Sequence, residues 1–573
     1  MGLIFAATFI VLLLLQPTLM RYLGRNQTTP PSETKPAAFP QAATPSAPVP
    51  LPKIPGGKKG TSEQELVIES DLYRITFSTR GALVKSWVLK RYTDDHGRPL
   101  ELVPSNTVVE TPEGLRPASE RYGYPMSLWT YDEGMRNKLN AALYVSSATG
   151  HIQAPATITF DFSDGETVVR KVFTFDNSYV VKVQTSAGNK GQVLPAYLAW
   201  PAGFGDQTTP MSFAASRIDS EYADKVDRLE AKKVSGGNTE RGPFSWAGTV
   251  DQYFGAVFLP DHPEDAVMVT LRSEVSIPKN LEKPDYKDMT KETVLGAAVG
   301  QQSGITNGRW FVGPKAIDVL ESVKAMPGSG QAGGPNLTGL VDFGFFGWFG
   351  KPLFLWLKWT QTKIPNWGWA IAIQTIIINL ALLPLRITSM KSAMKMQRVQ
   401  PQVNAIKKKY EKFSMKDPRK AEMNKEISAV FKENGVNPAG GCLPMVVQLP
   451  FLWAYYTMLG AAIELRHAPW LWIHDLSAPD PLHILPVLIV VSTFLMQRMT
   501  PTAGMDPSQQ KMMNLMMPIM LGFFSWSVAS GLGLYWLLGT VIAIVQQLVM
   551  NRTSMGQEMR AIAIKRARRK NQA

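Results

Sequence analysis

The chain has 573 residues, enough for two or three domains, and its near-zero mean hydropathy hides a very uneven distribution of apolar residues. Its net charge of +14 is concentrated in two segments. Residues 387–435 hold 12 Lys and Arg against 5 Asp and Glu, and residues 552–573 hold 7 against 1. The single cysteine, Cys442, excludes an intrachain disulfide, and we expect it to be a buried packing residue rather than a reactive thiol.

The first 23 residues form an apolar stretch that we interpret as a retained transmembrane anchor. Its apolar run from Gly2 to Met20 is longer than that of a typical signal peptide, and no small-x-small cleavage site follows it. A cleaved signal peptide is the alternative. The missing Lys or Arg at the front leaves open whether the true start codon lies upstream. Residues 24–61, rich in Pro, Ala, Thr and Ser, are predicted to be a disordered linker.

Residues 62–325 have the pattern of a soluble domain made of many short strands. Strands are predicted at 66–68, 73–77, 83–84, 87–89, 157–162, 167–175, 179–184, 253–259 and 266–271. The Gly, Pro, Asn and Asp residues at the breaks predict a large antiparallel β-sandwich, closed by a helix near 315–323. A glycine-rich hinge follows at 326–342. Its G-x-G-x-x-G lies outside any strand–helix context and no Walker A sequence occurs, so neither nucleotide binding nor ATP hydrolysis is predicted.

Four long uncharged stretches dominate the rest of the chain, and we interpret them as five membrane-spanning helices. A bilayer core is about 30 Å thick and a helix rises about 1.5 Å per residue, so the stretch 512–551 is long enough for two spans. The predicted spans are 364–386, 440–463, 482–499, 512–529 and 532–551, with loops at 464–481 and 500–511. With the N-terminal anchor, the predicted fold is a membrane helical bundle of six spans, five forming its core, plus the external β-sandwich.

The positive-inside rule orients these spans. It places both basic segments, and hence both chain termini, in the cytoplasm, and the 62–325 domain on the opposite side. The aromatic segment 343–360, with interleaved lysines, is predicted to be an amphipathic helix in the outer headgroup layer. A simple extension of the following span is the alternative.

The basic segment 387–435 has the apolar spacing of a helical hairpin. Residues at alternating steps of four and three are Val399, Val403, Ile406, Tyr410 and Phe413, continued by Met423, Ile427 and Val430. Asp417-Pro418 supplies the turn. A loop that is basic only to fix topology is the alternative, but topology alone does not require an apolar seam. The side chains expected to make cytoplasmic contacts are Lys391, Lys395, Lys407, Lys408 and Lys409.

Short motifs spread through the second half of the chain carry a family resemblance. They are Val-Asn-Pro-Ala-Gly-Gly-Cys-Leu-Pro at 436–444, Gln-Leu-Pro at 448–450, Ile-Glu-Leu-Arg-His-Ala-Pro at 463–469, Trp-Ile-His-Asp-Leu-Ser-Ala at 472–478 and Ser-Gly-Leu-Gly-Leu-Tyr at 530–535. In these segments the chain resembles the YidC-type membrane protein insertases of the Oxa/Alb superfamily, in the long form of double-membraned bacteria. Weaker matches at 310–314, 341–344 and 351–354 extend the resemblance over nearly the whole chain.

The resemblance implies an inner-membrane insertase and chaperone with its 62–325 domain in the periplasm. Five core helices would form a polar groove, open to cytoplasm and lipid, that inserts and folds nascent membrane proteins, alone or with the Sec translocon. Such a groove lowers the penalty for unsatisfied polar groups without a fuel step. The ribosome, targeting factors and anionic phospholipids are the expected partners of the basic segments, and the chain is expected to function as a monomer. No catalytic residue, metal or cofactor is predicted.

Polar side chains inside apolar spans are candidates for lining such a groove. They are Gln374, Thr375, Asn379, Gln448, Tyr535 and Trp536. Hydrogen bonding between helices is the alternative role. Gln546 and Gln547 are expected at the cytoplasmic interface.

One position departs from the family pattern. The resemblance implies an arginine five residues before Pro384, where this chain has Asn379. Arg386 lies seven residues further on, about two turns along the same predicted helical face. We hypothesise that it substitutes in part by snorkelling into the mouth of the groove. An ordinary anchor at the helix end is the alternative.

Two other functional classes were weighed. A solute transporter is disfavoured because we find neither an inverted repeat nor a charged residue in the middle of a span. The external domain could be an enzyme or a carbohydrate binder, since the β-sandwiches of this family resemble sugar mutarotases. Its three histidines, His96, His151 and His262, are scattered and show no partner pattern in the sequence, so no enzyme is predicted.

Overall fold

A computed structural model describes residues 57–105, 107–206, 216–279, 285–324, 336–413, 417–436, 443–499, 507–554, 557 and 561. The predicted anchor at 1–23, most of the linker 24–61, Cys442 and most of the tail 552–573 lie outside this set. Contacts divide the chain into two compact units, a β-rich unit ending at Asp342 and a helical unit from Phe343 onward, with residues 461–463 grouped with the first.

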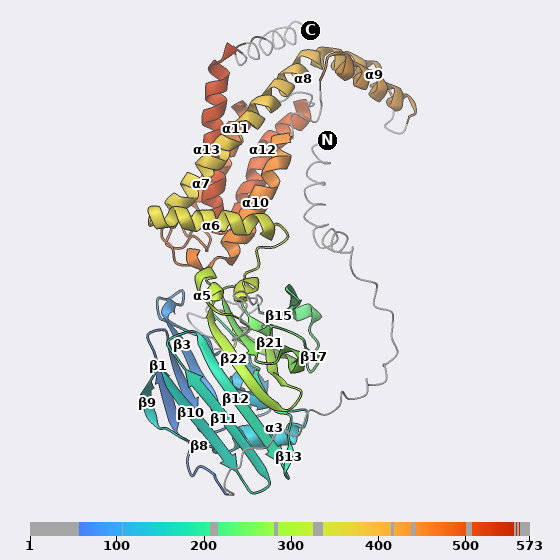
Figure 1. The fold of residues 1–573 in the computed structure, drawn as a ribbon. Coiled ribbons are helices and arrows are strands. Elements are labelled where there is room, and N and C mark those ends of the chain that lie inside the picture. Colours follow the sequence, from blue (N-terminus) through green and yellow to red (C-terminus); the bar gives the residue numbers. More distant parts are fainter. Residues whose placement is uncertain are drawn as a thin grey trace. The chain divides into compact units, whose positions relative to one another are not determined.

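Three sheets build the β-rich unit (Figure 1). The first has the order β4-β3-β2-β1-β9 and comprises β1 (Glu65–Glu69), β2 (Tyr73–Ser78), β3 (Leu83–Thr93), β4 (Pro99–Glu101) and β9 (Gly150–Gln153). The second has the order β16-β15-β18-β19-β22-β12-β11-β10-β8, with β13 beside β12. Its strands are β8 (Val145–Ser146), β10 (Ala156–Ser163), β11 (Thr167–Phe175), β12 (Val180–Asn189), β13 (Gln192–Val193), β15 (Arg217–Tyr222), β16 (Lys225–Glu230), β18 (Trp246–Val250), β19 (Phe254–Pro260) and β22 (Ile305–Pro314).

The third sheet has the order β6-β5-β20-β21-β14-β7, with β17 beside β20. Its strands are β5 (Val108–Thr111), β6 (Gly114–Pro117), β7 (Ser127–Trp129), β14 (Tyr197–Trp200), β17 (Thr239–Arg241), β20 (Ala266–Pro278) and β21 (Met289–Gln301). The short helices of this unit are α2 (Ala118–Tyr122), α3 (Glu133–Ala141), α5 (Ile317–Ser322), η2 (Ala231–Lys233), η3 (Pro263–Asp265) and η4 (Leu337–Leu340).

Strand pairing in the described part is antiparallel with one exception. Strand β9 pairs with β1 in parallel, with Leu66 opposite Gly150 and Glu69 opposite Gln153. The expectation of a purely antiparallel sandwich is therefore wrong at this edge. A parallel pair requires a long crossover, and the chain supplies about 80 residues between the two strands.

Aromatic side chains fill the core between the sheets. In β11 every second residue is buried, because side chains alternate between the two faces of a strand. Phe77 of β2 contacts Phe160 of β10 and Phe173 of β11, with ring centroids 5.5 and 5.2 Å apart. Trp87 of β3 packs on Trp200 of β14 at 5.9 Å. The first sheet is thus joined to both others through large rings, which supply much of the apolar burial.

Eight helices of more than ten residues form the described part of the helical unit (Figure 1). They are α6 (Gly347–Lys363), α7 (Trp367–Ala381), α8 (Leu383–Lys409), α9 (Arg419–Glu433), α10 (Leu443–Ala461), α11 (Ile484–Met499), α12 (Pro507–Ser525) and α13 (Ser530–Arg552), with the one-turn η6 (Ile463–Leu465). Asn366 caps α7 by accepting a hydrogen bond from the Trp369 amide, and Asp480 accepts one from the Leu485 amide at the start of α11.

Among the described residues, one straight helix is long and apolar enough to cross a membrane, namely α13. The pair α7 and α8, bent by 47° at their junction, would make a second span. Helix α11 and the Asn514–Ser525 part of α12 are apolar but shorter. The count of six spans therefore stays a prediction.

Candidate functional site

Three of the predicted polar residues share the buried side of α7. Gln374 and Thr375 have no exposed surface, and Asn379 is almost as deeply buried. Oγ1 of Thr375 donates to the carbonyl of Ile371, and Nδ2 of Asn379 donates to the carbonyl of Thr375. Each side chain thus has a hydrogen-bond partner on its own helix, and a groove-lining role for both residues stays a prediction.

Gln374 connects three helices. Its Nε2 donates to the carbonyl of Leu353 on α6 over 3.1 Å, and its Oε1 accepts a 2.5 Å hydrogen bond from the hydroxyl of Tyr455 on α10. The ring of Tyr455 stacks on Tyr535 of α13, with centroids 4.0 Å apart and planes 15° apart. We call Gln374, Thr375, Asn379, Tyr455 and Tyr535 the inner polar cluster. All five are neutral.

Small residues let α13 approach α7 beside this cluster. Gly539 and Ala543 are buried one turn apart on the same side of α13 as Tyr535. A Cβ added at Gly539 would lie 3.8 Å from Nδ2 of Asn379, so this face of α13 lies against the Asn379 side chain of α7. Small residues at a spacing of four are a common means of close helix contact in membranes.

Arg386 follows a bend in the chain. A single bent junction separates α7 from α8, with Pro384 in the first turn of α8, and Arg386 lies two residues after this proline. Proline lacks an N–H and disfavours helical geometry in the residue before it, which accounts for the break. Asn379 lies beside Gly539 and Arg386 hydrogen-bonds to Gln546, both on α13, so the predicted role of Arg386 stays a prediction.

A glutamine on α13 nevertheless connects the two positions. Nη1 of Arg386 donates to Oε1 of Gln546 over 2.8 Å, and Nε2 of the same amide donates to the carbonyl of Asn379 in a longer contact of 3.4 Å. Gln546 is half-buried, and Gln547 is buried and donates to Asn551. The expected position of both glutamines at the cytoplasmic interface of the membrane stays a prediction.

The remaining predicted residues lie further from this arrangement. Gln448 on α10 and Trp536 on α13 are half-buried, and in the described part of the chain neither side chain hydrogen-bonds to the inner polar cluster. Sequence reasoning missed Tyr455, and it named Gln546 only as a residue of the cytoplasmic interface. Tyr455 could have been found, since a tyrosine within an apolar span needs a partner for its hydroxyl.

The two helices of the basic segment, α8 and α9, contact each other, and their pairing along the apolar seam stays a prediction. Val399, Val403 and Tyr410 are buried on α8. Oε1 of Glu426 on α9 accepts hydrogen bonds from the Tyr410 hydroxyl and the Lys409 ammonium, each over 2.8 Å. The predicted contact lysines Lys391, Lys395, Lys407, Lys408 and Lys409 are all exposed.

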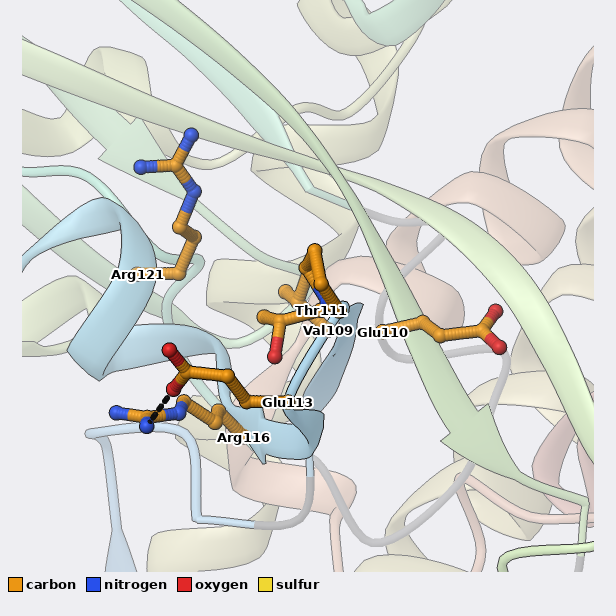
Figure 2. A pocket seen from close by; sticks show the side chains of 7 residues that line it. Val109, Glu110, Thr111, Glu113, Arg116 and Arg121 are labelled. Atoms are coloured by element: carbon orange, nitrogen blue, oxygen red, sulfur yellow. Dashed lines mark hydrogen bonds and ion pairs between the residues drawn. The ribbon is translucent and has the colours of Figure 1, made fainter.

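The β-rich unit contains a solvent-open hollow of about 400 Å³ beside β5, β6 and α2. Its lining consists of Val109, Glu110, Thr111, Pro112, Glu113, Arg116 and Arg121. Figure 2 shows Arg116 paired with Glu113, while Arg121 points away from them. The paired charges are exposed, so the hollow offers no activated group. In the described part of the chain no group of three or more His, Cys, Asp or Glu is arranged to hold a metal ion.

Buried charges in the β-rich unit are structural. The Lys171 ammonium of β11 donates to the carbonyls of Gly81, Ala82 and Met126 over 2.7, 3.2 and 2.7 Å, and burial lowers its pKa to about 7. Asp219 of β15 has no exposed surface, and Arg217 binds both of its oxygens. Burial raises the pKa of Asp219 despite this arginine.

Comparison with known proteins gives a consistent result over both units. Residues 65–356 match the family model described as YidC periplasmic domain, and residues 359–558 match that of the 60Kd inner membrane protein. The membrane protein insertase YidC of Syntrophus aciditrophicus is 32% identical over 551 residues, covering 92% of each chain. That of Citrifermentans bemidjiense is 33% identical over 504 residues, covering 85% of this chain and 86% of the other.

Among solved structures, a crystal structure of an active YidC insertase with its first transmembrane domain resolved covers 88% of this chain and 95% of its own. The identity is 17% and the TM-score 0.34. At this score the structural likeness adds nothing to the sequence matches.

Proposed function

The chain belongs to the YidC family of membrane protein insertases, and from this premise we propose that it inserts and folds nascent proteins of the inner membrane. The proposed activity includes a chaperone role, operates alone or with the Sec translocon, and requires no ATP hydrolysis. The observation that carries it within the helical unit is the inner polar cluster, a set of neutral hydrogen-bonding side chains packed among apolar helices.

The neutral side chains of the inner polar cluster are suited to receive a hydrophilic segment of a substrate. A hydrophilic segment entering hydrocarbon leaves each unsatisfied backbone group with a penalty of several kcal/mol. Amides and phenols can exchange their internal hydrogen bonds for bonds to such a segment without exposing a charge to lipid. Because the cluster is buried in this structure, substrate would reach it only when α7, α10 and α13 separate. The groove is thus proposed to open on substrate entry.

The proposed topology has six spans, with both chain termini in the cytoplasm and residues 62–325 in the periplasm. The exposed lysines Lys407, Lys408 and Lys409 at the end of α8 support a role for the hairpin at an anionic surface. Ribosomal RNA, targeting factors and anionic phospholipids are the proposed partners, and the monomer is the proposed functional form.

Depletion of the chain in its host, followed by insertion of a small two-span substrate, tests the proposal. Insertion measured by protease protection should fall on depletion and return when the gene is supplied in trans. Reconstituted vesicles without ATP should insert the same substrate. Unchanged insertion after depletion would refute the insertase assignment, and a requirement for ATP would refute only the fuel-free part.

A further inference from the structure

The ring of Tyr131 is exposed on the surface of the β-rich unit, yet it is held on several sides. The residue is 59% exposed and lies between β7 and α3. Its ring makes edge-to-face contacts with Trp129 and Tyr197, with centroids 4.8 and 6.4 Å apart, and its hydroxyl shares a 2.8 Å hydrogen bond with Oγ1 of Thr239 on β17. A ligand that packs on a side chain already fixed in this way immobilises few further rotamers, which lowers the entropic cost of binding.

The residues that support Tyr131 are themselves well packed. The rings of Trp129 and Tyr197 are stacked, with planes 13° apart, and both belong to one buried hydrophobic cluster. The guanidinium of Arg136, on α3, lies over the Trp129 ring at 5.6 Å from its centroid. We call this group the tyrosine platform, and it consists of Trp129, Tyr131, Arg136, Tyr197 and Thr239.

Exposed aromatic rings are suited to recognise proline-rich segments. Such segments favour the polyproline II helix, which is extended before binding, and their prolines dock on aromatic-lined surfaces at a low cost in entropy. This chain contains a proline-rich segment at 45–55, with prolines at positions 45, 48, 50, 52 and 55. The segment ends two residues before Gly57, the first residue that the structure describes.

The described chain enters the β-rich unit within reach of the tyrosine platform. The Gly60 amide donates to the carbonyl of Leu143 over 2.9 Å, just after α3. Tyr131 lies just before α3, whose 9 residues span about 14 Å. A polyproline II helix rises about 3.1 Å per residue, so residues 45–55 can extend over about 34 Å. The segment is therefore long enough to run from the entry point to Tyr131.

We propose that the proline-rich segment 45–55 docks on the tyrosine platform, with its pyrrolidine rings packed on Tyr131. Because segment and platform belong to one chain, the effective concentration of the segment is on the order of millimolar, and a contact of modest affinity is therefore occupied. Docking would hold the end of the linker on the β-rich unit and leave residues 24–44 as the free connection to the predicted anchor. The inference goes beyond the proposed insertase function and does not depend on it.

The experiment uses the full-length chain, purified in detergent, with the photo-crosslinking residue benzoylphenylalanine in place of Val49. After illumination and digestion with trypsin, mass spectrometry identifies the peptide joined to this residue. Docking predicts a crosslink to the tryptic peptide 122–136, which contains Trp129 and Tyr131. An excess of a synthetic peptide of residues 41–57 should compete with the tethered segment and lower the yield.

Two variants and two matched controls make the test specific. The variants are Tyr131→Ala and the triple change Pro48→Ala, Pro50→Ala and Pro52→Ala. The controls are Tyr286→Ala, at another exposed tyrosine of the β-rich unit, and the triple change Pro30→Ala, Pro31→Ala and Pro36→Ala, outside the segment. Thermal unfolding in detergent establishes that each variant is folded.

The crosslink should depend on both surfaces. Tyr131→Ala should lower its yield about two- to tenfold, the range for loss of an aromatic contact. The triple proline change within the segment should lower the yield by a similar factor, and it leaves every residue of the platform unchanged. Both controls should retain the yield of the unmodified chain.

Three results would overturn the proposal. The first is an unchanged yield in either Tyr131→Ala or the triple proline variant of the segment. The second is a crosslink that forms mainly between two chains when differently tagged chains are mixed, which would assign the platform to the linker of a second copy. The third is competition by maltoheptaose but not by the peptide of residues 41–57, which would make the platform a carbohydrate site. None of these results bears on insertion, which the depletion experiment tests separately.

Discussion

The two units of this chain bury polar groups in opposite ways. In the β-rich unit the buried groups include ionisable side chains that are held by several partners, such as Asp219 between arginines and Lys171 under three carbonyls. In the inner polar cluster of the helical unit the buried groups are neutral, and each has one or two partners.

The two kinds of buried group differ in the free-energy cost of losing one hydrogen-bond partner. A buried charge is stable only when its partners are fixed, because removing one leaves an uncompensated charge. A neutral amide or phenol loses about 1 kcal/mol of stability when it loses one hydrogen bond, so it can exchange one partner for another more easily. Substitutions at the buried polar sites of the β-rich unit are therefore expected to lower its stability strongly. Substitutions in the inner polar cluster of the helical unit should each lower its stability only slightly.

The largest effect is expected from Asp219→Ala in the β-rich unit. Among the described residues, the change leaves Arg217 and Arg228 with Asp342 as their one shared acidic partner, and loss of a buried ion pair destabilises by about 3 kcal/mol. Pulse proteolysis of the full chain in urea, with fragments of residues 57–324 identified by mass, measures this loss. Asp71→Ala, at an exposed site in the β1–β2 turn, is the control. If the two variants have similar urea midpoints of unfolding, the buried ion pairs of Asp219 do not contribute the expected stability.

Lys171→Met should have the next largest effect, about 2 kcal/mol, because three buried carbonyls lose their donor. The variant should also lose a pH dependence. The pKa of Lys171 is about 7 when folded and near 10.4 when unfolded, so the unfolded state binds more protons between these values. The free energy of unfolding of the unmodified chain should rise from about pH 7 to about pH 10, and this gain is lost as the pH falls back through about 7.

Urea unfolding of the β-rich unit between pH 6 and 10 measures this slope. The control is Lys182→Met, at an exposed position of β12. If Lys171→Met retains the slope of the unmodified chain, another group must be responsible for it.

A smaller effect is expected from Tyr455→Phe in the helical unit. The variant keeps the ring stack on Tyr535 but removes the donor to Gln374, which should lower stability by about 0.6–1 kcal/mol. Thermal unfolding in detergent checks this, with Tyr456→Phe as the control because the neighbouring tyrosine is exposed. A loss as large as that of Asp219→Ala would show that the helical unit is no more tolerant than the β-rich unit.

The sequence predicted some parts of this molecule better than others. Strand patterns such as that of β11 are visible because one face is apolar, whereas the long strand β21 was missed because its buried half, rich in Ala and Gly, gives no alternation. Strand β22 was missed because Thr, Asn, Gly and Arg dominate its first half. Gln374, Thr375 and Asn379 could be found as polar residues in an apolar stretch. The connection from Arg386 through Gln546 could not, because it depends on a bend in the chain and on a helix 160 residues away.

The smallest effect is expected in the hairpin of α8 and α9, because its charges are exposed. They differ both from the buried ionisable groups of the β-rich unit and from the neutral groups of the inner polar cluster. Glu426→Gln weakens the acceptor shared by Lys409 and Tyr410, while the apolar seam with Val403 remains. Exposed ion pairs contribute little and are screened within about 10 Å at 0.1 M salt. Amide hydrogen exchange in α8 and α9 should therefore increase slightly at low salt, and the difference from the unmodified chain should vanish at high salt. Glu433→Gln, exposed on the same helix, should have no effect at either salt concentration. An increase that persists at high salt would mean that Glu426 holds the hairpin by direct hydrogen bonding, as the buried groups of the β-rich unit do.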